Sequence, residues 1–537
     1  MRWLVSFLIM AVAWDGAALA QPSAPYQVAE KDIPTLQADM AAGRVTSAEL
    51  VRAYIARIDA LDRGGPQLRA VIAVNPNAIA DAAALDGERK TKGARGPLHG
   101  IPILVKDNIE TADPMPTTAG SLALADNVTH RDAPLIARLR AAGAVILGKT
   151  NLSEWANFRS SRSISGWSGM GGLAKNPYVL DRNPCGSSAG SAVAVAASLA
   201  AAAIGTETNG SLVCPGSFNG IASFKPTLGM VSRTHVVPIS HNQDTAGPMA
   251  RSVGDAAILL NAISGSDPAD EATSKADANK SDFSGLSDAS LQGKRLGVVM
   301  PPPGSMPSDG DLLLTQALAA MKARGAEIVE ITDFRIPPQA SFSGGDLQRL
   351  VLQYDFKHDL NAWLASLPAG RIRTLSDLIV FNAATPRETA LFGQNIFIES
   401  DARGELNDPL YLQAHEELTR VATGSLDDLL GRYRLDALIR PTTEPAFRID
   451  TVRSDSAGGG EFTGLAAVAG YPHLTVPMGL VHGLPVGLSF IGPAWSDAKI
   501  LALGFAYEQA SHARKAPEYL PSLEATEGAN SAFAPVH

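Results

Sequence analysis

Two serines and one lysine stand in segments whose composition suits catalysis. Lys106 follows directly on the short apolar run 101–105. Ser187 lies in a segment of small residues, and Ser211 ends the polar loop 205–211. A run that is apolar on both faces is typical of a buried strand, and strand ends deliver side chains into crevices. We therefore expect the Lys106 amine to be removed from water.

A desolvated lysine beside serines could support nucleophilic catalysis. A serine hydroxyl is a poor nucleophile unless a base takes its proton, and a lysine can be that base only when neutral. Moving a lysine pKa from ~10.4 toward 7 requires about 4.6 kcal/mol of differential stabilisation, which burial can supply. Each feature alone is weak, because glycine- and serine-rich segments are usually loops and a lysine after a strand is usually solvated.

Three short motifs suggest other chemistry, and each is better explained by structure. Segment 143–150 matches the P-loop pattern, but its middle residues Ala-Val-Ile-Leu belong in a strand rather than a phosphate cradle. Segment 186–190 matches G-x-S-x-G around Ser188, yet the proline-containing segment 176–184 cannot be the strand that such a nucleophile elbow requires. Segment 496–499 matches S-x-x-K without a following K-T-G, and its serine is expected to cap the last helix.

The charge of the chain argues against nucleic acid as a partner. The 537 residues carry a net charge of −9, and no block of basic residues occurs. An acidic surface without a basic patch has no electrostatic reason to bind nucleic acid or an anionic membrane. We expect a globular enzyme that acts on a small molecule or a peptide, and nothing in the sequence indicates an oligomeric state.

The first twenty residues have the three parts of a secretory signal peptide. Arg2 precedes the apolar run 3–13, and Ala18-Leu-Ala20 forms a cleavage site. The run is too short to span a bilayer, and no later stretch is a membrane-span candidate. We expect residues 1–20 to be removed near Ala20, which leaves a periplasmic or secreted protein with no integral membrane segment.

Cysteine and histidine usage gives no indication of a metal centre. The two cysteines, Cys185 and Cys214, lie within three residues of Ser187 and Ser211, and whether they pair is left open. An oxidising compartment would permit a disulfide. The ten histidines are scattered and form no H-E-x-x-H motif, so we expect neither a metal nor a cofactor.

Strand and helix patterns alternate along most of the chain, which indicates an α/β protein with much parallel sheet. Thr46-Ser-Ala-Glu49 is a capping box that opens a helix. We expect one domain over 21–537, with a core at about 30–265 and 435–515 and a largely helical insertion at about 266–434. The predicted helices lie at 133–142, 191–203, 312–324, within 345–435 and at 498–511. The predicted strands lie at 101–105, 144–147, 296–300, 328–331, 437–439, 474–478 and 486–491, with a loop from 204 to 211.

Several long segments, taken in order, resemble the amidase signature family. They are Gly96-Pro-Leu-His-Gly-Ile-Pro-Ile-Leu-Val-Lys106, Gly186-Ser-Ser-Ala-Gly-Ser, Gly205-Thr-Glu-Thr-Asn-Gly-Ser211, Phe224-Lys-Pro-Thr and Gln243-Asp-Thr-Ala-Gly-Pro-Met. The separations fit as well, with 81 residues from Lys106 to Ser187 and 24 from Ser187 to Ser211. The resemblance runs from about residue 30 to 515. It implies a three-layer α/β fold in which a large, mixed, twisted sheet is covered by helices on both faces.

The resemblance also implies a role for each site residue. Ser211 is the nucleophile, Ser187 carries its proton to Lys106 and returns a proton to the leaving amine, and the peptide bond before Ser187 is cis. Backbone N–H groups of the loop would stabilise the oxyanion, and one such donor can be worth ~3 kcal/mol. The residues expected to bind the oxyanion or substrate are Thr208, Asn209 and Gly210, and those expected to support the site are Gly186 and Ser188.

The resemblance narrows the expected substrate to amides. Segments 149–158 and 238–247 are most similar to bacterial peptide amidases, which remove ammonia from C-terminally amidated peptides. Two positions differ from that pattern, because Asn209 stands where Asp is expected and Ala189 where Gly or Ser is expected. The alternatives are a broad aryl or aliphatic amidase or esterase, a transamidation subunit that works on charged tRNA, and a binding protein without activity.

Overall fold

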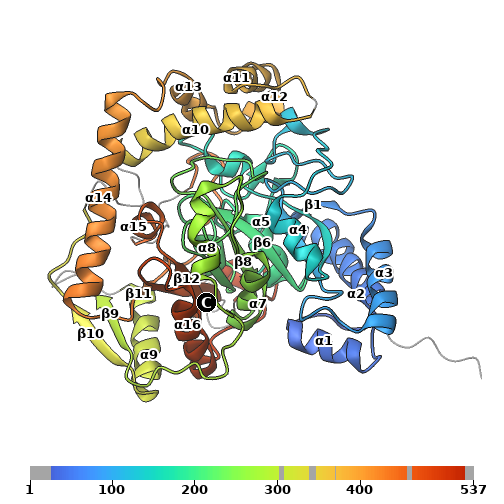
Figure 1. Ribbon diagram of the computed structural model, residues 1–537, viewed down its shortest axis with the longest axis vertical. Helices are drawn as coiled ribbons and strands as arrows, with labels where there is room; N and C mark the ends of the chain where they lie inside the picture. Colours follow the sequence, from blue (N-terminus) through green and yellow to red (C-terminus); the bar gives the residue numbers. More distant parts are fainter. Residues whose placement is uncertain (1–25, 301–307, 338–345, 369, 456–461, 527–537) are drawn as a thin grey trace, which may run out of the picture.

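The computed structural model describes residues 26–300, 308–337, 346–368, 370–455 and 462–526, so the expected signal peptide lies outside the described residues. A mixed sheet runs through the molecule (Figure 1). Its 11 strands stand in the order β1-β3-β2-β6-β8-β7-β12-β13-β11-β9-β10. Its strands are β1 Val71–Val74, β2 Pro102–Lys106, β3 Val145–Thr150, β6 Ala202–Glu207, β7 Ala222–Lys225, β8 Thr245–Ala250, β9 Arg295–Val299, β10 Glu327–Ile331, β11 Ala437–Pro441, β12 His473–Val481 and β13 Leu484–Ile491. A separate two-stranded ribbon joins β4 Trp167–Ser168 to β5 Gly172–Leu173.

The sheet is less parallel than the alternation of strands and helices suggested. Four of its neighbouring pairs are parallel and six are antiparallel. The late hairpin of β12 and β13 inserts between β7 and β11, and strands arriving from distant parts of the chain need not run parallel. The expected mixed α/β sheet is confirmed, with the parallel pairs in the minority.

Helices cover this sheet, whose central strands are buried on both faces. Helices α5 and α6 pack on one another, and α7, α9 and α16 form a second group of packed helices. The helices are α1 Ile33–Ala41, α2 Ser47–Arg57, α3 Ala78–Lys92, α4 Pro134–Ala141, α5 Ala189–Ala196, α6 Val213–Phe218, α7 Val253–Ile263, α8 Ala276–Asn279, α9 Asp309–Ala323, α10 Asp346–Ser366, α11 Leu375–Ala384, α12 Pro386–Thr389, α13 Asn395–Asp401, α14 Pro409–Arg432, α15 Thr463–Val468 and α16 Asp497–Ser511. No helix in the described ranges is long and apolar enough to cross a membrane.

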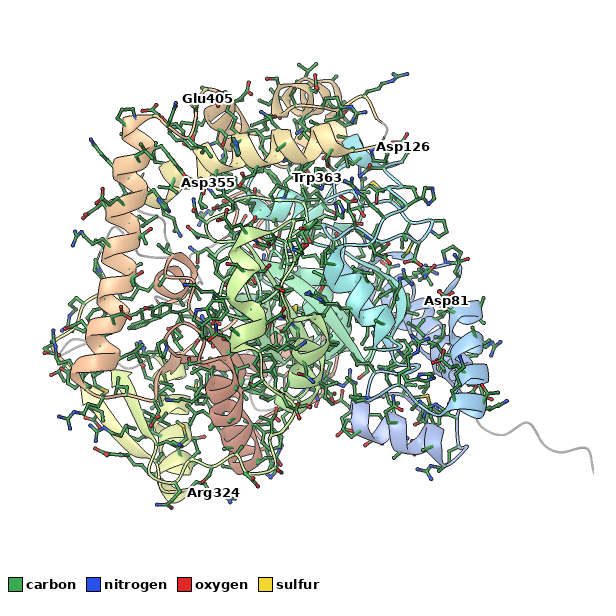
Figure 2. The ribbon with its side chains drawn as sticks, viewed as in Figure 1. Asp81, Asp126, Arg324, Asp355, Trp363 and Glu405 are labelled. Atoms are coloured by element: carbon green, nitrogen blue, oxygen red, sulfur yellow. A yellow bond between two sulfur atoms is a disulfide. The ribbon has the colours of Figure 1, made fainter. Side chains whose placement is uncertain are left out.

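The segment expected to be a helical insertion contains both helices and strands. Helices α10 to α13 lie together above the sheet, and α14 runs along one side of the molecule (Figure 1). Trp363 on α10, labelled in Figure 2, donates a hydrogen bond of 2.9 Å to Glu110, which follows strand β2. Earlier in the same segment, β9 and β10 extend the edge of the main sheet.

Local sequence signals explain where several of these elements begin. The Thr46 hydroxyl accepts from the Glu49 backbone N–H while the Glu49 carboxylate accepts from the Thr46 N–H, which is the predicted capping box of α2. The P-loop-like segment 143–150 contains the buried strand β3, which confirms the predicted strand but continues beyond its predicted end at 147 to Thr150. Ser496 stands at the N-cap position of α16, but its hydroxyl donates to the Pro493 carbonyl and does not cap the helix.

The helix predicted at 191–203 was too long. Helix α5 ends at Ala196, and the chain turns through Ser198, which has a φ of 54°, before β6 begins at Ala202. All eight residues of α5 are buried, so no change from an apolar to a polar face marks its end. In such a uniform run, tertiary packing decides between helix and strand.

Candidate active site

Lys106 and Ser187 meet in the interior of the protein. Lys106 ends β2, and its Nζ lies 2.7 Å from the Ser187 Oγ. The Lys106 side chain is 0 % exposed and Ser187 is 1 % exposed, so bulk water does not reach this contact. The buried strand end predicted for Lys106 is confirmed, and it places the amine against one of the two predicted serines.

Thr206, on the neighbouring strand β6, completes the surroundings of the Lys106 amine. The Nζ lies 3.2 Å from the Thr206 carbonyl oxygen and 2.8 Å from its Oγ1. A neutral amine has two N–H donors and one lone pair. If Thr206 takes the two donors, the lone pair faces the Ser187 hydroxyl, which is the arrangement that a base requires.

Burial gives Lys106 the acidity that this role demands. Desolvation lowers the pKa of Lys106 to about 7, although the carboxylates of Asp244 and Glu207 act in the opposite direction. Near neutral pH a large share of the amine is therefore uncharged and able to accept a proton.

The backbone around Ser187 is tightly enclosed. The Gly186–Ser187 peptide bond is cis, as the resemblance implied. A Cβ on Gly186 would lie 2.1 Å from the Ser153 Oγ, so a larger residue at this position would require the Ser153 side chain to move. The Ser187 carbonyl accepts a hydrogen bond of 3.0 Å from the Ser153 N–H, which fixes the neighbouring peptide plane.

Ser211 lies on the loop between β6 and α6, at the more exposed end of the predicted group. It is 8 % exposed, compared with 1 % for Ser187 and 0 % for Lys106. Gly210, just before it, has a φ of 78°, a left-handed conformation that favours glycine. On the far side, the Glu207 carboxylate accepts from the Leu212 N–H at 2.7 Å, which holds the chain directly after the serine.

Ser188 connects the two serine-bearing segments. Its Oγ donates to the Thr206 carbonyl at 2.9 Å and accepts from the Thr206 N–H at 3.2 Å. Its own N–H donates to the Ser211 carbonyl at 3.2 Å. These bonds make Ser188 a link between the two segments. Segment 176–184 forms only isolated bridges and no strand, so Ser188 does not stand on a nucleophile elbow.

Thr208 and Asn209, two of the three residues predicted to bind the oxyanion or substrate, are hydrogen-bonded to side chains that were not predicted as part of the site. The Thr208 hydroxyl donates to Asp244, and the Thr208 carbonyl accepts from the Gln243 amide at 3.0 Å. The Asn209 amide donates to Gln348 of α10 at 3.1 Å. Asp244 and Gln243 stand in a segment that matched the family pattern, which was a usable signal, whereas nothing in the sequence pointed to Gln348.

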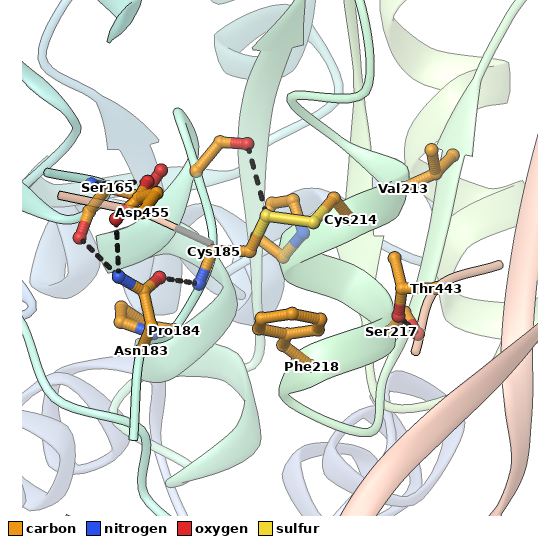
Figure 3. Close-up of a disulfide and its surroundings, with 12 residues drawn as sticks. Ser165, Asn183, Pro184, Cys185, Val213, Cys214, Ser217, Phe218, Thr443 and Asp455 are labelled. Carbon is orange, nitrogen blue, oxygen red and sulfur yellow. Dashed lines mark hydrogen bonds between the residues drawn. A yellow bond between two sulfur atoms is a disulfide. The ribbon is translucent and has the colours of Figure 1, made fainter. Parts of the chain in front are cut away.

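A disulfide bridge joins the segments that carry Ser187 and Ser211. Cys185 and Cys214 are bonded, with their Cα atoms 6.0 Å apart (Figure 3). The Cys185 N–H donates to the Asn183 side chain at 2.7 Å, and Asn183 in turn donates to Asp455. The two cysteines, whose pairing the sequence left open, are therefore bonded, and Cys185 lies two residues before Ser187.

The described residues contain one cluster of side chains suited to holding a metal ion. It does not include Lys106, Ser187 or Thr206. It consists of His241, His358 and Asp359. The scattered histidines of the sequence are thus partly brought together by the fold. The contacts of Lys106 and Ser187 involve only protein groups that donate or accept protons, which suits acid–base and nucleophilic chemistry.

Known proteins resemble the chain along most of its length. The sequence matches the Amidase family over residues 49–501. It is 38% identical over 527 residues to a probable amidase of Arabidopsis thaliana, covering 96% of each chain. It is 34% identical over 515 residues to one of the subunits of the glutamyl-tRNA(Gln) amidotransferase of Ralstonia nicotianae, covering 90% of this chain and 98% of that one.

Solved structures give the same answer at the level of the fold. The native peptide amidase of Stenotrophomonas maltophilia superposes with a TM-score of 0.85 at 49% identity, covering 91% of this chain and 99% of that one. An amidase family protein of Bacillus anthracis superposes with a TM-score of 0.82 at 34% identity, covering 91% and 93%. The chain belongs to the amidase family, with the fold of that family. It is an enzyme that hydrolyses amides.

Proposed function

We propose that this enzyme removes ammonia from the C-terminal amides of peptides through an acyl-enzyme on Ser211. The observation that carries the mechanism is the contact of 2.7 Å between the Lys106 Nζ and the Ser187 Oγ, together with the burial that lowers the Lys106 pKa to about 7. A base of this kind can draw a proton from a serine without any histidine.

In the proposed acylation, neutral Lys106 accepts the Ser187 proton, and Ser187 accepts the proton of Ser211. The Ser211 Oγ then bonds to the carboxamide carbon, whose oxygen becomes an oxyanion facing the N–H groups of loop 208–211. The C–N bond breaks as Ser187 donates a proton to the nitrogen, and ammonia leaves. Water repeats the sequence on the ester, which releases the carboxylic acid and restores the Ser211 hydroxyl.

The similarity to a solved peptide amidase supports the choice of substrate. At 49% identity over most of both chains, the S. maltophilia enzyme is nearer in sequence than the amidotransferase of R. nicotianae, which is 34% identical. Asn209 is where we expect this enzyme to differ, because its amide reaches Gln348 and its Oδ1 is buried without a protein partner. A substrate N–H could bond to this oxygen only after a shift of the Asn209 side chain, because the oxygen is closed to solvent.

An ammonia-release assay tests the proposal directly. An amidated dipeptide should yield ammonia and the free dipeptide acid, and Ser211→Ala should abolish the release while the protein stays folded. A fluorophosphonate probe should label the parent enzyme on Ser211 and leave Ser211→Ala unlabelled. A catalytically active Ser211→Ala would refute the acyl-enzyme.

A broad amidase or esterase is the main alternative. Rates on an amidated dipeptide, an anilide and a short aliphatic amide separate the two, and a preference for the anilide or the aliphatic amide would reject the peptide assignment. The transamidation alternative predicts that glutamine-dependent ammonia transfer to charged tRNA exceeds peptide deamidation, which the same enzyme preparation can test.

We further propose that the enzyme is exported. The disulfide between Cys185 and Cys214 supports this, because such bridges persist in oxidising compartments. Cell fractionation followed by N-terminal sequencing should find a chain that starts near Gln21 outside the cytoplasm. An uncleaved chain in the cytosol would reject export and would favour the tRNA alternative.

A further inference from the structure

We propose that His241, His358 and Asp359 form a binding site for a divalent cation of the zinc class. The bound cation links loop 239–244, which contacts segment 208–211, to helix α10. One ligand atom from each of the three residues lies within 4.8 Å of the others. Two imidazole nitrogens and one carboxylate oxygen form a ligand set that Zn²⁺ accepts, with the fourth position left for water.

The three side chains already face one another. The His241 Nδ1 lies 2.9 Å from Asp359 Oδ2, and the His358 Nδ1 lies 2.8 Å from Asp359 Oδ1. The two imidazole rings are 6.3 Å apart between centroids. A cation that replaces the protons shared between these nitrogens and the carboxylate needs only small side-chain shifts.

The two histidines of the site are partly exposed, whereas its aspartate is largely buried. The side chains of His241 and His358 are 41 % and 53 % exposed, whereas that of Asp359 is 12 % exposed. Asp359 also accepts from the His241 backbone N–H at 2.7 Å, which orients its carboxylate. A cation can therefore enter from solvent and meet a ligand that is already fixed.

The surrounding charges are of both signs. Arg233 donates to the His241 carbonyl, but its positive charge is paired with Asp270 at 2.6 Å. Asp355, one turn before Asp359 on α10 and labelled in Figure 2, accepts from the Asn242 amide at 3.0 Å. The negative charge of Asp355 favours a cation nearby, and the Arg233 charge is largely offset by its partner.

The position of the site gives it a route to the nucleophile segment. His241 belongs to the loop 239–244, whose Asp244 and Gln243 hold Thr208. His358 and Asp359 belong to α10, whose Gln348 accepts from Asn209. A cation that joins loop 239–244 to α10 therefore stabilises both supports of the segment that leads to Ser211.

Calorimetric titration of tag-free enzyme with zinc chloride tests the site. We expect one saturable Zn²⁺ site per chain, with affinity reduced by about tenfold or more in His241→Gln and in His358→Gln. His482→Gln is the matched control, because His482 is 68 % exposed and lies 3.8 Å from Asp309. The control should bind Zn²⁺ as the parent does.

Hydrogen exchange provides a second readout. Zn²⁺ should slow amide exchange in 239–244 in the parent and leave it unchanged in His358→Gln, whose metal-free Tm should equal that of the parent. Absence of saturable Zn²⁺ uptake by the parent would overturn the proposal. Equal uptake by His358→Gln and His482→Gln would overturn it as well, because the cation would then bind elsewhere.

Discussion

The Lys106 Nζ lies 2.7 Å from the Ser187 Oγ, and both side chains are almost completely closed to solvent. The two residues are 81 positions apart in the chain and come from a strand end and a glycine-rich turn. In the proposed mechanism, this contact lets the Lys106 amine, whose pKa is lowered by burial, accept the proton of the Ser187 hydroxyl.

Replacing Lys106 by Met should remove catalysis and leave the fold intact. Methionine is of similar length and carries no charge that must be desolvated, so the free energy of unfolding should not fall markedly. We expect kcat/KM for an amidated dipeptide to drop by about 10⁴-fold, close to the loss in Ser211→Ala, because residues that act as a unit fail together. The double variant should lose little more than either single one. Additive losses would show that the two residues act independently.

The pH dependence of the parent should follow the Lys106 amine. Because burial lowers its pKa to about 7, the amine is protonated below that value and cannot accept the Ser187 proton. We expect log(kcat/KM) to rise with a slope near one up to about pH 7 and then level off. A steady-state profile on an amidated dipeptide measures it. A profile that falls between pH 6 and pH 8 would contradict the assignment of Lys106 as the base.

Asn209→Asp should move this profile toward higher pH. The carboxylates of Asp244 and Glu207 already raise the Lys106 pKa. A further negative charge at position 209, close to Glu207 in the chain, acts in the same direction. The midpoint of the rising limb should therefore increase, and activity at pH 7 should fall. Asn209→Ala removes the contact to Gln348 without adding charge, so its midpoint should match that of the parent.

How far the site could be predicted from the sequence depends on how far apart in the sequence the contacting residues are. The strand that ends at Lys106 was predictable, because a short run that is apolar on both faces is a local signal. The contact of Asn209 with Gln348 spans 139 residues and that of Thr208 with Asp244 spans 36, and neither leaves a local pattern. The pairing of Cys185 with Cys214 likewise became known only once the fold brought their segments together.

The end of α5 could not be predicted for a different physical reason. Helix α5 consists of Ala, Gly, Ser and Val, strand β6 opens with two alanines, and both elements are entirely buried. Hydrophobic periodicity distinguishes helix from strand only when one face meets water. The sequence therefore located Ser187 and Ser211 on either side of this stretch, but the predicted helix was too long, and residues 204–207, predicted as part of a loop, belong to strand β6.

Loss of the disulfide should destabilise the enzyme and disturb catalysis. The bridge closes a loop with a sequence separation of 29, for which the chain-entropy model gives about 3–4 kcal/mol in the free energy of unfolding. The double variant Cys185→Ser, Cys214→Ser should show a lower Tm and a lower kcat, since the bridge holds the segments of Ser187 and Ser211 together. The parent treated with a reductant should behave in the same way. An unchanged Tm in both samples would show that the bridge contributes nothing.

The fit of Gly186 against Ser153 can be tested by a double-mutant cycle. A Cβ at position 186 would lie 2.1 Å from the Ser153 Oγ but 3.4 Å from the Ser153 Cβ. Gly186→Ala should therefore unfold at a lower temperature and lose activity, because the clash displaces the residue before Ser187. Adding Ser153→Ala removes the clashing oxygen, so the double variant should recover part of the loss, with a coupling energy of about 1–3 kcal/mol.

Gly87→Ala provides the matched control for this cycle. Gly87 lies on the exposed side of α3, with nothing within 4 Å of the added Cβ. Alanine there should raise the free energy of unfolding by about 0.5–1 kcal/mol, because glycine is the poorer helix former. If Gly186→Ala were as harmless as Gly87→Ala, the close approach to Ser153 would not constrain the turn that carries Ser187. If Ser153→Ala failed to restore any stability to Gly186→Ala, the constraint would come from a different neighbour.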